Sequence, residues 1–275
     1  MQTSTIHPRI CQRSVLRYLS QYMRFLCIAG AAGLLAGLEQ TPARAEAAEY
    51  IQLFDGQSLA NWEGDAPYWS VRDGAILGQI TPETRIDKNR FLVYQGDVPA
   101  DFEFIAEFRV SADGNSGVNY RSEVVDGIDF HALRGYQCDI DGRNRYTGSN
   151  YEERRRTTLA SIGESVVVPN VDGADTLAHV AQNRWTASVA QGGLKSPADL
   201  RANVKQGTWN EVRVVAVGNR LRHYINGELT SEVVDNDLAN RRRDGKLGIQ
   251  VHVGPPMTIE YRNLRLRALS DVAEE

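Results

Sequence analysis

Polar side chains with the chemistry for proton transfer or ligand binding occur in two segments whose pattern predicts β-strands, Ser116–Ser122 and Gly135–Ile140. Successive side chains of a strand point to opposite faces of a sheet. We therefore predict Gln137, Asp139 and Asp141 on one face, with the apolar side chains between them on the other. Such a face offers both carboxylates and an amide to a ligand or to a reacting group.

The two carboxylates, Asp139 and Asp141, are candidate proton-transfer groups. Gln137 is better suited to orienting a ligand hydroxyl, because its amide both donates and accepts hydrogen bonds. Arg121 in the first segment is always charged and could hold an anion or a pair of hydroxyls. Two alternatives stay open for Asp139 and Asp141: ion pairs in a surface turn, or oxygen ligands for a divalent cation such as calcium.

More candidate groups follow along the chain. Glu153 and His252 are candidate acid–base groups, and His252 could instead be a hydrogen-bonded core histidine. Glutamates 152 and 153 and the three arginines after them could also form a solvated charge run. Candidate substrate-binding residues from this region and from the longer segment beyond it are Tyr151, Glu152, Arg156 and Trp185.

The first 45 residues have the pattern of a secretory signal peptide. Several arginines precede the apolar run Phe25–Leu38, and Ala43-Arg44-Ala45 follows it. The apolar run is short for a membrane span, although an uncleaved anchor is the alternative. We expect residues 46–275 to form one exported domain, periplasmic or secreted, with no stable membrane insertion after cleavage.

The composition of residues 46–275 excludes some classes of partner. This part contains 26 basic and 34 acidic residues, a formal net charge of −8. It therefore lacks the basic footprint that nucleic-acid binding requires. Cys138 is its only cysteine, so no disulfide can form within it. Cys138 alternates with polar residues on the apolar side of its strand and is expected to be buried and unreactive.

Short strands separated by turn signals dominate the expected domain. Asp73-Gly74, Gly218-Asn219 and Asn226-Gly227 are predicted hairpin turns. One short helix is predicted at Pro197–Val204, capped by the preceding serine. This pattern favours an all-β fold, a two-sheet jelly-roll sandwich. The segment Arg143–Gly193 is weakly patterned and is expected to be one long, ordered, functional loop.

The order and spacing of several short motifs resemble a known family, the 3-keto-disaccharide hydrolase domain, over nearly all of residues 50–268. The matching segments are Phe54-Asp55-Gly56, Trp69–Ile76, Asp101–Phe104, Asn115–Arg121, Gly135-Tyr136-Gln137, Gly248–His252 and Tyr261–Leu264. The chain is most similar to a branch in which this strand is followed by Tyr146-Thr147-Gly148 and Tyr151-Glu152-Glu153. That branch continues with an arginine between two glycines. Here Arg155 and Thr157 stand where those glycines are expected.

The resemblance implies a concanavalin A-like jelly roll and an exported enzyme that acts on glycosides oxidised to a ketone at sugar carbon 3. The ketone acidifies the proton on carbon 2, so the glycosidic bond can be cleaved by elimination through an enolate, followed by hydration. This route requires a base, an acid and an electrophile for the ketone oxygen. It requires no cofactor, but a separate dehydrogenase must supply the oxidised sugar.

Two other functions stay open from sequence. A jelly roll can be a non-catalytic carbohydrate-binding module or a structural domain, because fold does not decide function. No nucleophile elbow, zinc-protease motif or dinucleotide-binding glycine turn occurs in the chain. The leading hypothesis is therefore a 3-keto-glycoside hydrolase or a related lyase.

Overall fold

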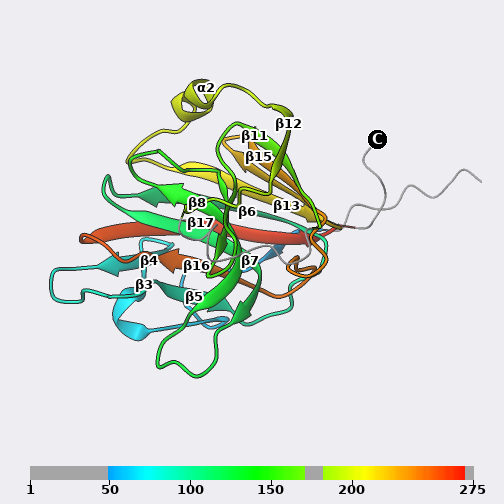
Figure 1. Cartoon of the computed structure of the whole chain (residues 1–275). Coiled ribbons are helices and arrows are strands. Elements are labelled where there is room, and N and C mark those ends of the chain that lie inside the picture. The colour runs from blue at the N-terminus through cyan, green and yellow to red at the C-terminus, as the bar shows by residue number, and fades with distance from the viewer. Residues whose placement is uncertain (1–48, 171–181, 270–275) are drawn as a thin grey trace, which may run out of the picture. The chain divides into compact units, whose positions relative to one another are not determined.

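The described part of the chain is a sandwich of two β-sheets (Figure 1). A computed structural model describes residues 49–170 and 182–269. Strands account for most of these residues, with one short α-helix, α2 (Pro197–Ala202), and a 3₁₀ turn, η1 (Ala66–Tyr68). The predicted all-β jelly-roll sandwich is confirmed.

Sheet A is the ten-stranded sheet. The order of nine of its strands is β12 (Val189–Gly193), β11 (Glu164–Val168), β15 (Glu228–Asp235), β14 (Arg220–Ile225), β13 (Asn210–Val217), β6 (Phe102–Val110), β17 (Met257–Ala268), β4 (Ala75–Ile80) and β3 (Trp69–Arg72). The short strand β1 (Ile51–Gln52) also pairs with β17.

Sheet B is the seven-stranded sheet. Its order is β10 (Thr157–Ala160), β9 (Asn150–Glu153), β8 (Leu133–Asp141), β7 (Asn115–Val124), β16 (Lys246–Val251), β5 (Arg90–Tyr94) and β2 (Trp62–Gly64). All its neighbouring strand pairs are antiparallel. Sheets of this kind can bury one face and leave the other for solvent or ligand.

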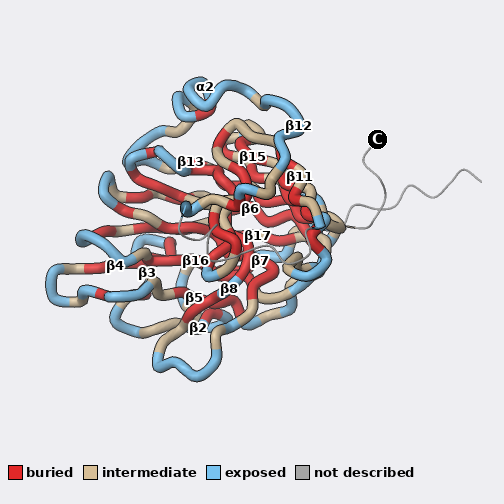
Figure 2. The backbone as a smooth tube through the Cα atoms, viewed as in Figure 1, coloured by how far each residue is buried: buried red, intermediate tan, exposed pale blue. Residues whose placement is uncertain are grey.

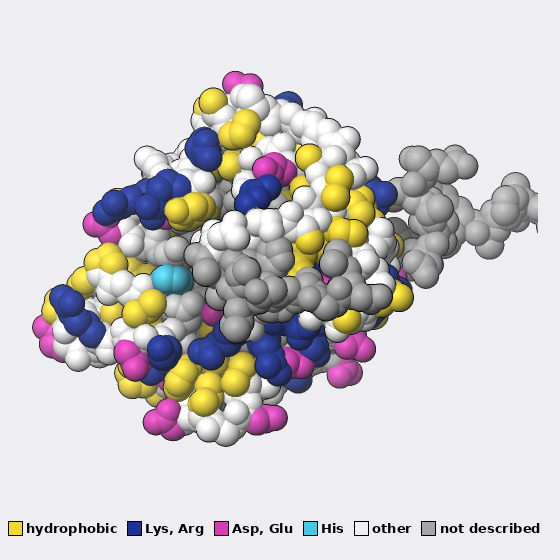
Figure 3. Space-filling model, in the orientation of Figure 1, with side chains coloured by type: hydrophobic (Ala, Val, Ile, Leu, Met, Phe, Trp, Pro, Cys, Tyr) yellow, Lys and Arg dark blue, Asp and Glu magenta, His cyan; other side chains and the backbone are white. Residues whose placement is uncertain are grey.

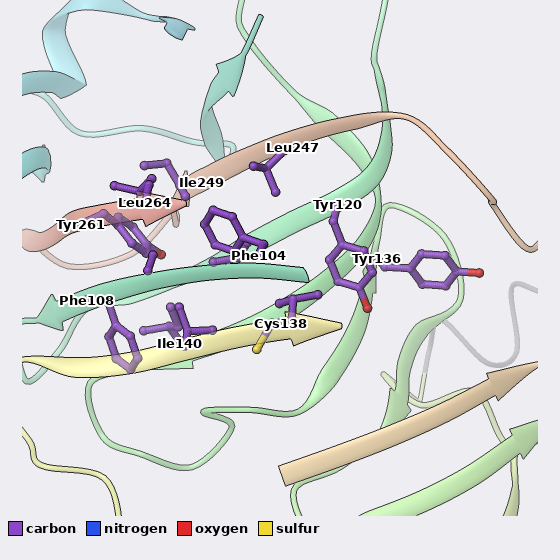
Figure 4. Close-up of a cluster of buried hydrophobic side chains, with 14 of the residues drawn as sticks. Phe104, Phe108, Tyr120, Tyr136, Cys138, Ile140, Leu247, Ile249, Tyr261 and Leu264 are labelled. Atoms are coloured by element: carbon purple, nitrogen blue, oxygen red, sulfur yellow. The ribbon is translucent and has the colours of Figure 1, made fainter. Parts of the chain in front are cut away.

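The hydrophobic core lies between the two sheets and follows the alternation of the strands. Figure 2 shows buried residues along the strands and exposed residues mainly in the turns. Phe104 and Phe108 of β6 meet Cys138 and Ile140 of β8 and Ile249 of β16 in one cluster (Figure 4). Cys138 is a free, fully buried thiol, as expected, and burial raises its pKa well above the usual value.

The predicted turns form where the sequence signals them. Asp73 and Gly74 both have positive φ angles (51° and 76°) between β3 and β4, and Asn226 and Gly227 (49° and 82°) do the same between β14 and β15. This backbone twist matches that of the flanking strands. The predicted helix is confirmed as α2, and the side chain of its N-cap Ser196 accepts a hydrogen bond from the backbone of Asp199.

A bulge in β7 lies at Arg121, whose side chain is buried in the structure. The register shifts between Tyr120 and Glu123, and Arg121 has a φ of +44°. Its buried guanidinium donates to the backbone oxygens of Ala100 (2.8 Å) and Gly218 (2.7 Å), next to sheet A. The expectation that Arg121 binds substrate is therefore corrected: the side chain joins the two sheets.

A buried ion cluster holds two further predicted site residues inside the sandwich. Arg156 donates to Glu152 of β9 (Nε to Oε2, 2.6 Å) and to Asp235 at the end of β15 (Nη2 to Oδ2, 2.6 Å). Asp237 adds a third carboxylate at 3.3 Å, and the Tyr136 hydroxyl donates to Asp235. Glu152 and Arg156 are thus not substrate contacts, because each is at most 1 % exposed.

The segment 143–193 is not the single long loop expected from its weak pattern. It contains four strands, β9 to β12, of which β9 and β10 extend sheet B and β11 and β12 extend sheet A. Strand β11 runs parallel to β15. Residues 171–181 of this segment lie outside the described residues.

The predicted signal peptide, residues 1–45, also lies outside the described residues. Within the part that the structure describes, no helix is both long enough and apolar enough to cross a membrane.

Charges of both signs are interspersed on the molecular face drawn in Figure 3. Many arginines of the domain are paired with carboxylates across neighbouring strands. Examples are Arg109 with Glu260 (2.7 Å) and Arg262 with Glu107 (2.6 Å).

We predict that Arg156→Met lowers the free energy of unfolding by about 3–5 kcal/mol, because it leaves buried carboxylates without their counter-charge. Urea denaturation measures the loss. The control is Arg143→Met, whose pair with Asp113 is exposed and which should change stability by less than about 1 kcal/mol. An Arg156→Met protein as stable as the control would contradict the structural role.

Candidate active site on the outer face of sheet B

The outer face of sheet B, which points away from the core, carries a group of polar side chains from three strands. Register pairs Gln137 of β8 with Tyr151 of β9, and Gly135 with Glu153. Side chains of paired residues share a face, so Gln137, Tyr151 and Glu153 lie together. Asp139 lies two residues further along β8 and therefore faces the same way.

A chain of hydrogen bonds connects the two carboxyl groups of this face. Gln137 donates from Nε2 to Asp139 (2.8 Å to Oδ1). Gln250 of β16 donates from Nε2 to Gln137 (3.1 Å to Oε1) and to Glu153 (3.3 Å to Oε2). Asn89 adds long contacts to Glu153 at 3.4 and 3.5 Å. Two amides thus join Asp139 to Glu153.

Gly117 of β7 makes the connection between β8 and β16 possible. It pairs with Asp139 in the register of β7 and β8. A Cβ atom at this position would lie 2.5 Å from the side chain of Gln137. The side chain of Gln137 therefore extends across β7 toward Gln250 only because residue 117 has no side chain.

Asp139 is prepared to hold a proton at neutral pH. Burial raises its pKa to about 8, the hydrogen bond from Gln137 acts in the opposite direction, and the charges of Glu153 and Asp141 add to the increase. Its side chain is nevertheless only half-buried. A protonated carboxyl with an open side can donate a proton to a bound ligand.

Glu153 is in a different electrostatic environment. Burial also raises its pKa, but the positive charge of Arg154 and hydrogen bonds from Asn89 and Gln250 oppose the shift. The nearest contact between the two side chains is 4.0 Å, from Arg154 Nε to Glu153 Oε1. The two carboxyl groups thus differ. Asp139 favours its acid form, whereas a neighbouring cation supports the ionised form of Glu153.

Tyr151 on this face and His252 just beyond the end of β16 are two further titratable groups. Burial, and then the charges of Glu153 and Asp139, raise the pKa of Tyr151, so its phenol remains a hydrogen-bond donor. Burial lowers the pKa of His252, against a backbone hydrogen bond with Val253. His252 Nδ1 donates to the Val253 oxygen (2.6 Å), which leaves Nε2 of the neutral ring as an acceptor.

A loop, residues 125–132, forms one border of the site. Phe130 in this loop packs against Arg90 (3.8 Å from guanidinium carbon to ring centroid) and is 6.0 Å from Arg154. Asp65 holds the loop through the ring and backbone nitrogens of His131 (2.8 and 3.3 Å). The loop therefore places an aromatic ring against Arg90 and near Arg154.

The structure brings together four of the predicted site residues on this face: Gln137, Asp139, Tyr151 and Glu153. His252 lies just beyond the end of β16, where its backbone nitrogen donates to the backbone oxygen of Asn115. Asp141 lies apart from the four. Its carboxylate accepts hydrogen bonds from the backbone of Arg145 (2.7 Å) and from its side chain (3.2 Å), which closes the turn after β8. Asp141 is therefore corrected from a proton-transfer group to a turn-forming residue.

Trp185 is corrected as well. It is 1 % exposed and belongs to the core cluster, and its backbone nitrogen donates to Thr158 of β10 (2.9 Å). A buried indole cannot stack on a sugar ring. Four predicted binding residues therefore lie away from the outer face of sheet B: Arg121, Glu152, Arg156 and Trp185.

Sequence reasoning missed three residues at the site: Asn89, Arg154 and Gln250. Gln250 had a detectable signal, because it alternates with His252 between apolar residues of one strand. Asn89 lies in the connection before β5 and Arg154 lies in a turn, so neither had such a signal. Within the described residues, no three His, Cys, Asp or Glu side chains are grouped so as to hold a metal ion.

Comparison with known proteins identifies the family of the chain. The family model described as "3-keto-alpha-glucoside-1,2-lyase-like domain" matches residues 49–267. The chain belongs to this family. The resemblance found in the sequence is thereby confirmed. A search of curated proteins gave no match.

Similar solved structures have low sequence identity to this chain. A putative glycosyl hydrolase from Parabacteroides distasonis has 16% identity and a TM-score of 0.50, over 80% of this chain and 100% of that chain. A carbohydrate-binding module, CBM66, from Bacillus subtilis has 14% identity and a TM-score of 0.44, over 76% and 96%. The VIP36 exoplasmic/lumenal domain has 14% identity and a TM-score of 0.47, over 83% and 92%.

We predict that Glu153→Gln lowers the pKa of Asp139 from about 8, because the change removes a neighbouring negative charge. Carboxyl ¹³C NMR of aspartate-labelled protein measures the shift. Glu83→Gln, an exposed carboxylate outside this face, should leave the titration of Asp139 unchanged. An Asp139 pKa that stays constant or rises in Glu153→Gln is the result that contradicts the coupling.

Proposed function

We propose that this protein cleaves glycosides that carry a ketone at sugar carbon 3, by elimination of the group on carbon 1 and addition of water. The observation that supports this most directly is the pair of carboxyl groups on the outer face of sheet B. Burial raises the pKa of both groups, that of Asp139 to about 8, whereas at Glu153 the charge of Arg154 and two hydrogen bonds oppose the rise. Family membership adds to it, since the family is named for a lyase of 3-keto-glucosides.

The first step removes the proton on carbon 2. Glu153 takes this proton, and the electrons of the C–H bond form the enolate of the ketone. Reformation of the ketone then creates the double bond between carbons 1 and 2 and breaks the bond from carbon 1 to the leaving oxygen. Asp139 gives its proton to that oxygen, so the leaving group departs as an alcohol.

The second step reverses the two roles. After elimination Glu153 is protonated and Asp139 is ionised, so Asp139 can accept a proton from water as it adds to carbon 1. Glu153 returns its proton to carbon 2. The pair is thereby restored to its starting state, and neither an oxidant nor a reductant is consumed.

The remaining polar groups of the face fit the binding of the sugar. The amides of Gln137 and Gln250 position the carboxyl groups through hydrogen bonds, and Tyr151 offers a phenol donor. His252 presents an acceptor nitrogen. Export through residues 1–45 and supply of the oxidised sugar by a separate dehydrogenase belong to the same proposal.

The rival function is a carbohydrate-binding module without catalysis. The two functions differ in what they require of Asp139, because a binding module gains little from a carboxyl that retains its proton at neutral pH. Two measurements separate these functions. One is an assay of turnover with 3-keto-glycosides of both anomers, and the other is calorimetry of their binding. Binding without any turnover would leave only the module.

We predict that Asp139→Asn and Glu153→Gln affect substrates differently. Loss of the acid should slow a 3-keto-disaccharide at least about a hundredfold, because its sugar leaving group needs a proton. A 4-nitrophenyl 3-keto-glucoside, which leaves as a stable anion, should be slowed much less. Glu153→Gln should slow both, because carbon 2 must lose its proton in each. Release of sugar or nitrophenol measures the rates.

Equal losses for both substrates in Asp139→Asn would rule out its role as the acid. Asp73→Asn serves as the control, because Asp73 is an exposed aspartate in the turn between β3 and β4 of the other sheet and asparagine accepts its positive φ. Its rate should stay within about threefold of wild type.

The rate should also depend on pH in a bell-shaped manner. The acid must be protonated, so kcat should fall as the pH rises through about 8, the pKa of Asp139. The base must be ionised, so kcat should fall as the pH decreases through the raised pKa of Glu153. Asp139→Asn should remove the alkaline limb for the nitrophenyl substrate. Persistence of that limb would assign it to another group.

A further inference from the structure

Arg154 is a cation at the site whose hydrogen-bond donors are not used by any described residue. Its guanidinium is partly exposed and has two neighbours, Glu153 (4.0 Å) and the ring of Phe130 (6.0 Å). The next arginine, Arg155, donates to the backbone oxygen of Asn240 (3.1 Å) and is therefore already engaged. Arg154 is thus available to a ligand.

The backbone directs Arg154 to this position. Successive residues of a strand point to opposite faces, so a continued β9 would send residue 154 to the face opposite Glu153. Arg154 instead has a φ of +57°, in the left-handed region that is rare for residues other than glycine. The strand ends there, and the side chain lies beside Glu153. Strained conformations of this kind are concentrated at functional sites.

Other cations near the face are committed. Arg90 packs on Phe130, donates to the backbone oxygen of Lys88 (3.0 Å) and lies 3.5 Å from Asp65. Arg121, which the sequence suggested as a group that holds an anion or a pair of hydroxyls, is buried between the sheets. Of these, Arg154 alone combines closeness to the carboxyl pair with free donors.

We propose that Arg154 binds the ketone oxygen of the substrate and stabilises the enolate that forms when carbon 2 loses its proton. This inference rests on the proposed function. The ketone oxygen is attached to the carbon next to the one that is deprotonated, so a base and a cation must stand side by side. Glu153 and Arg154 do so, with 4.0 Å between their nearest charged atoms.

The charge changes of the step are balanced by this pair. Glu153 becomes neutral as it takes the proton, and the negative charge moves through the C–H electrons to the ketone oxygen. Arg154 therefore exchanges one anionic neighbour, the carboxylate, for another, the enolate oxygen. Its planar guanidinium can donate to that oxygen without any change in its own protonation.

The test isolates enolate formation from cleavage. The probe is a 3-keto sugar with hydrogen in place of the leaving group, and NMR follows exchange of its carbon-2 proton in D₂O. Arg154→Gln should slow this exchange and the elimination of a 3-keto-disaccharide by about a hundredfold or more in kcat, the usual cost of losing one oxyanion donor. Arg154→Lys should retain part of the rate. Added guanidinium ion should restore part of the exchange rate of Arg154→Gly. Glycine suits this test because it adopts the positive φ of residue 154 without strain.

Arg134→Gln is the matched control, since it removes an arginine of the same sheet that is bound to Glu123, and it should exchange the probe at the wild-type rate. The role of Arg154 is overturned if Arg154→Gln exchanges the probe at the wild-type rate, or if it raises KM and leaves kcat unchanged. In either case turnover by the wild-type protein would still support the proposed function. Absence of both exchange and turnover in the wild-type protein overturns both.

Discussion

The buried charge cluster around Arg156 is the constraint on which the outer face of sheet B depends. It joins Glu152 of β9 to Asp235 of β15 and thus connects one sheet to the other through charged groups inside the sandwich. Charges in such a place are tolerated only when they are paired closely. The position and rotation of β9 are therefore determined by an interaction on its inner side.

The consequence for the outer side follows from strand geometry. With Glu152 held inward, its neighbours Tyr151 and Glu153 must face outward, next to Gln137. Two adjacent glutamates with the same chemistry thus have unrelated tasks, one in the interior and one at the candidate site. The amides of Gln137 and Gln250 then set the relation between Glu153 and Asp139 across β8 and β16.

The fold could be predicted from the sequence because its determinants are local and repeated. Alternating apolar residues in β6 and β8 and glycine turns such as Asp73-Gly74 specify paired strands with one buried face. The segment 143–193 was harder, because its strands are short and β11 pairs in parallel with the distant β15. Such pairing leaves no signal in a local pattern.

The site was predictable only where strand phase was clear. Gln137 and Asp139 follow an apolar alternation that fixes their face, whereas Arg121 stands at a bulge that the pattern does not reveal. Nothing in the run of charges from 152 to 156 indicates which members point inward, because that is decided by Asp235 on the other sheet. Arg154 was missed because a turn, and not a strand, sets its direction.

Thr157 lies at the end of the same turn with a φ of +66°, at a position where the related branch carries glycine. Glycine would adopt this angle without strain but would also leave the unfolded chain much freer. A β-branched residue restricts that freedom, so less conformational entropy is lost when the turn becomes ordered. At a positive φ the strain of a β-branched residue outweighs this entropic gain. Packing and hydrogen bonding around Thr157, and not its own conformational preference, must therefore hold the turn that presents Arg154.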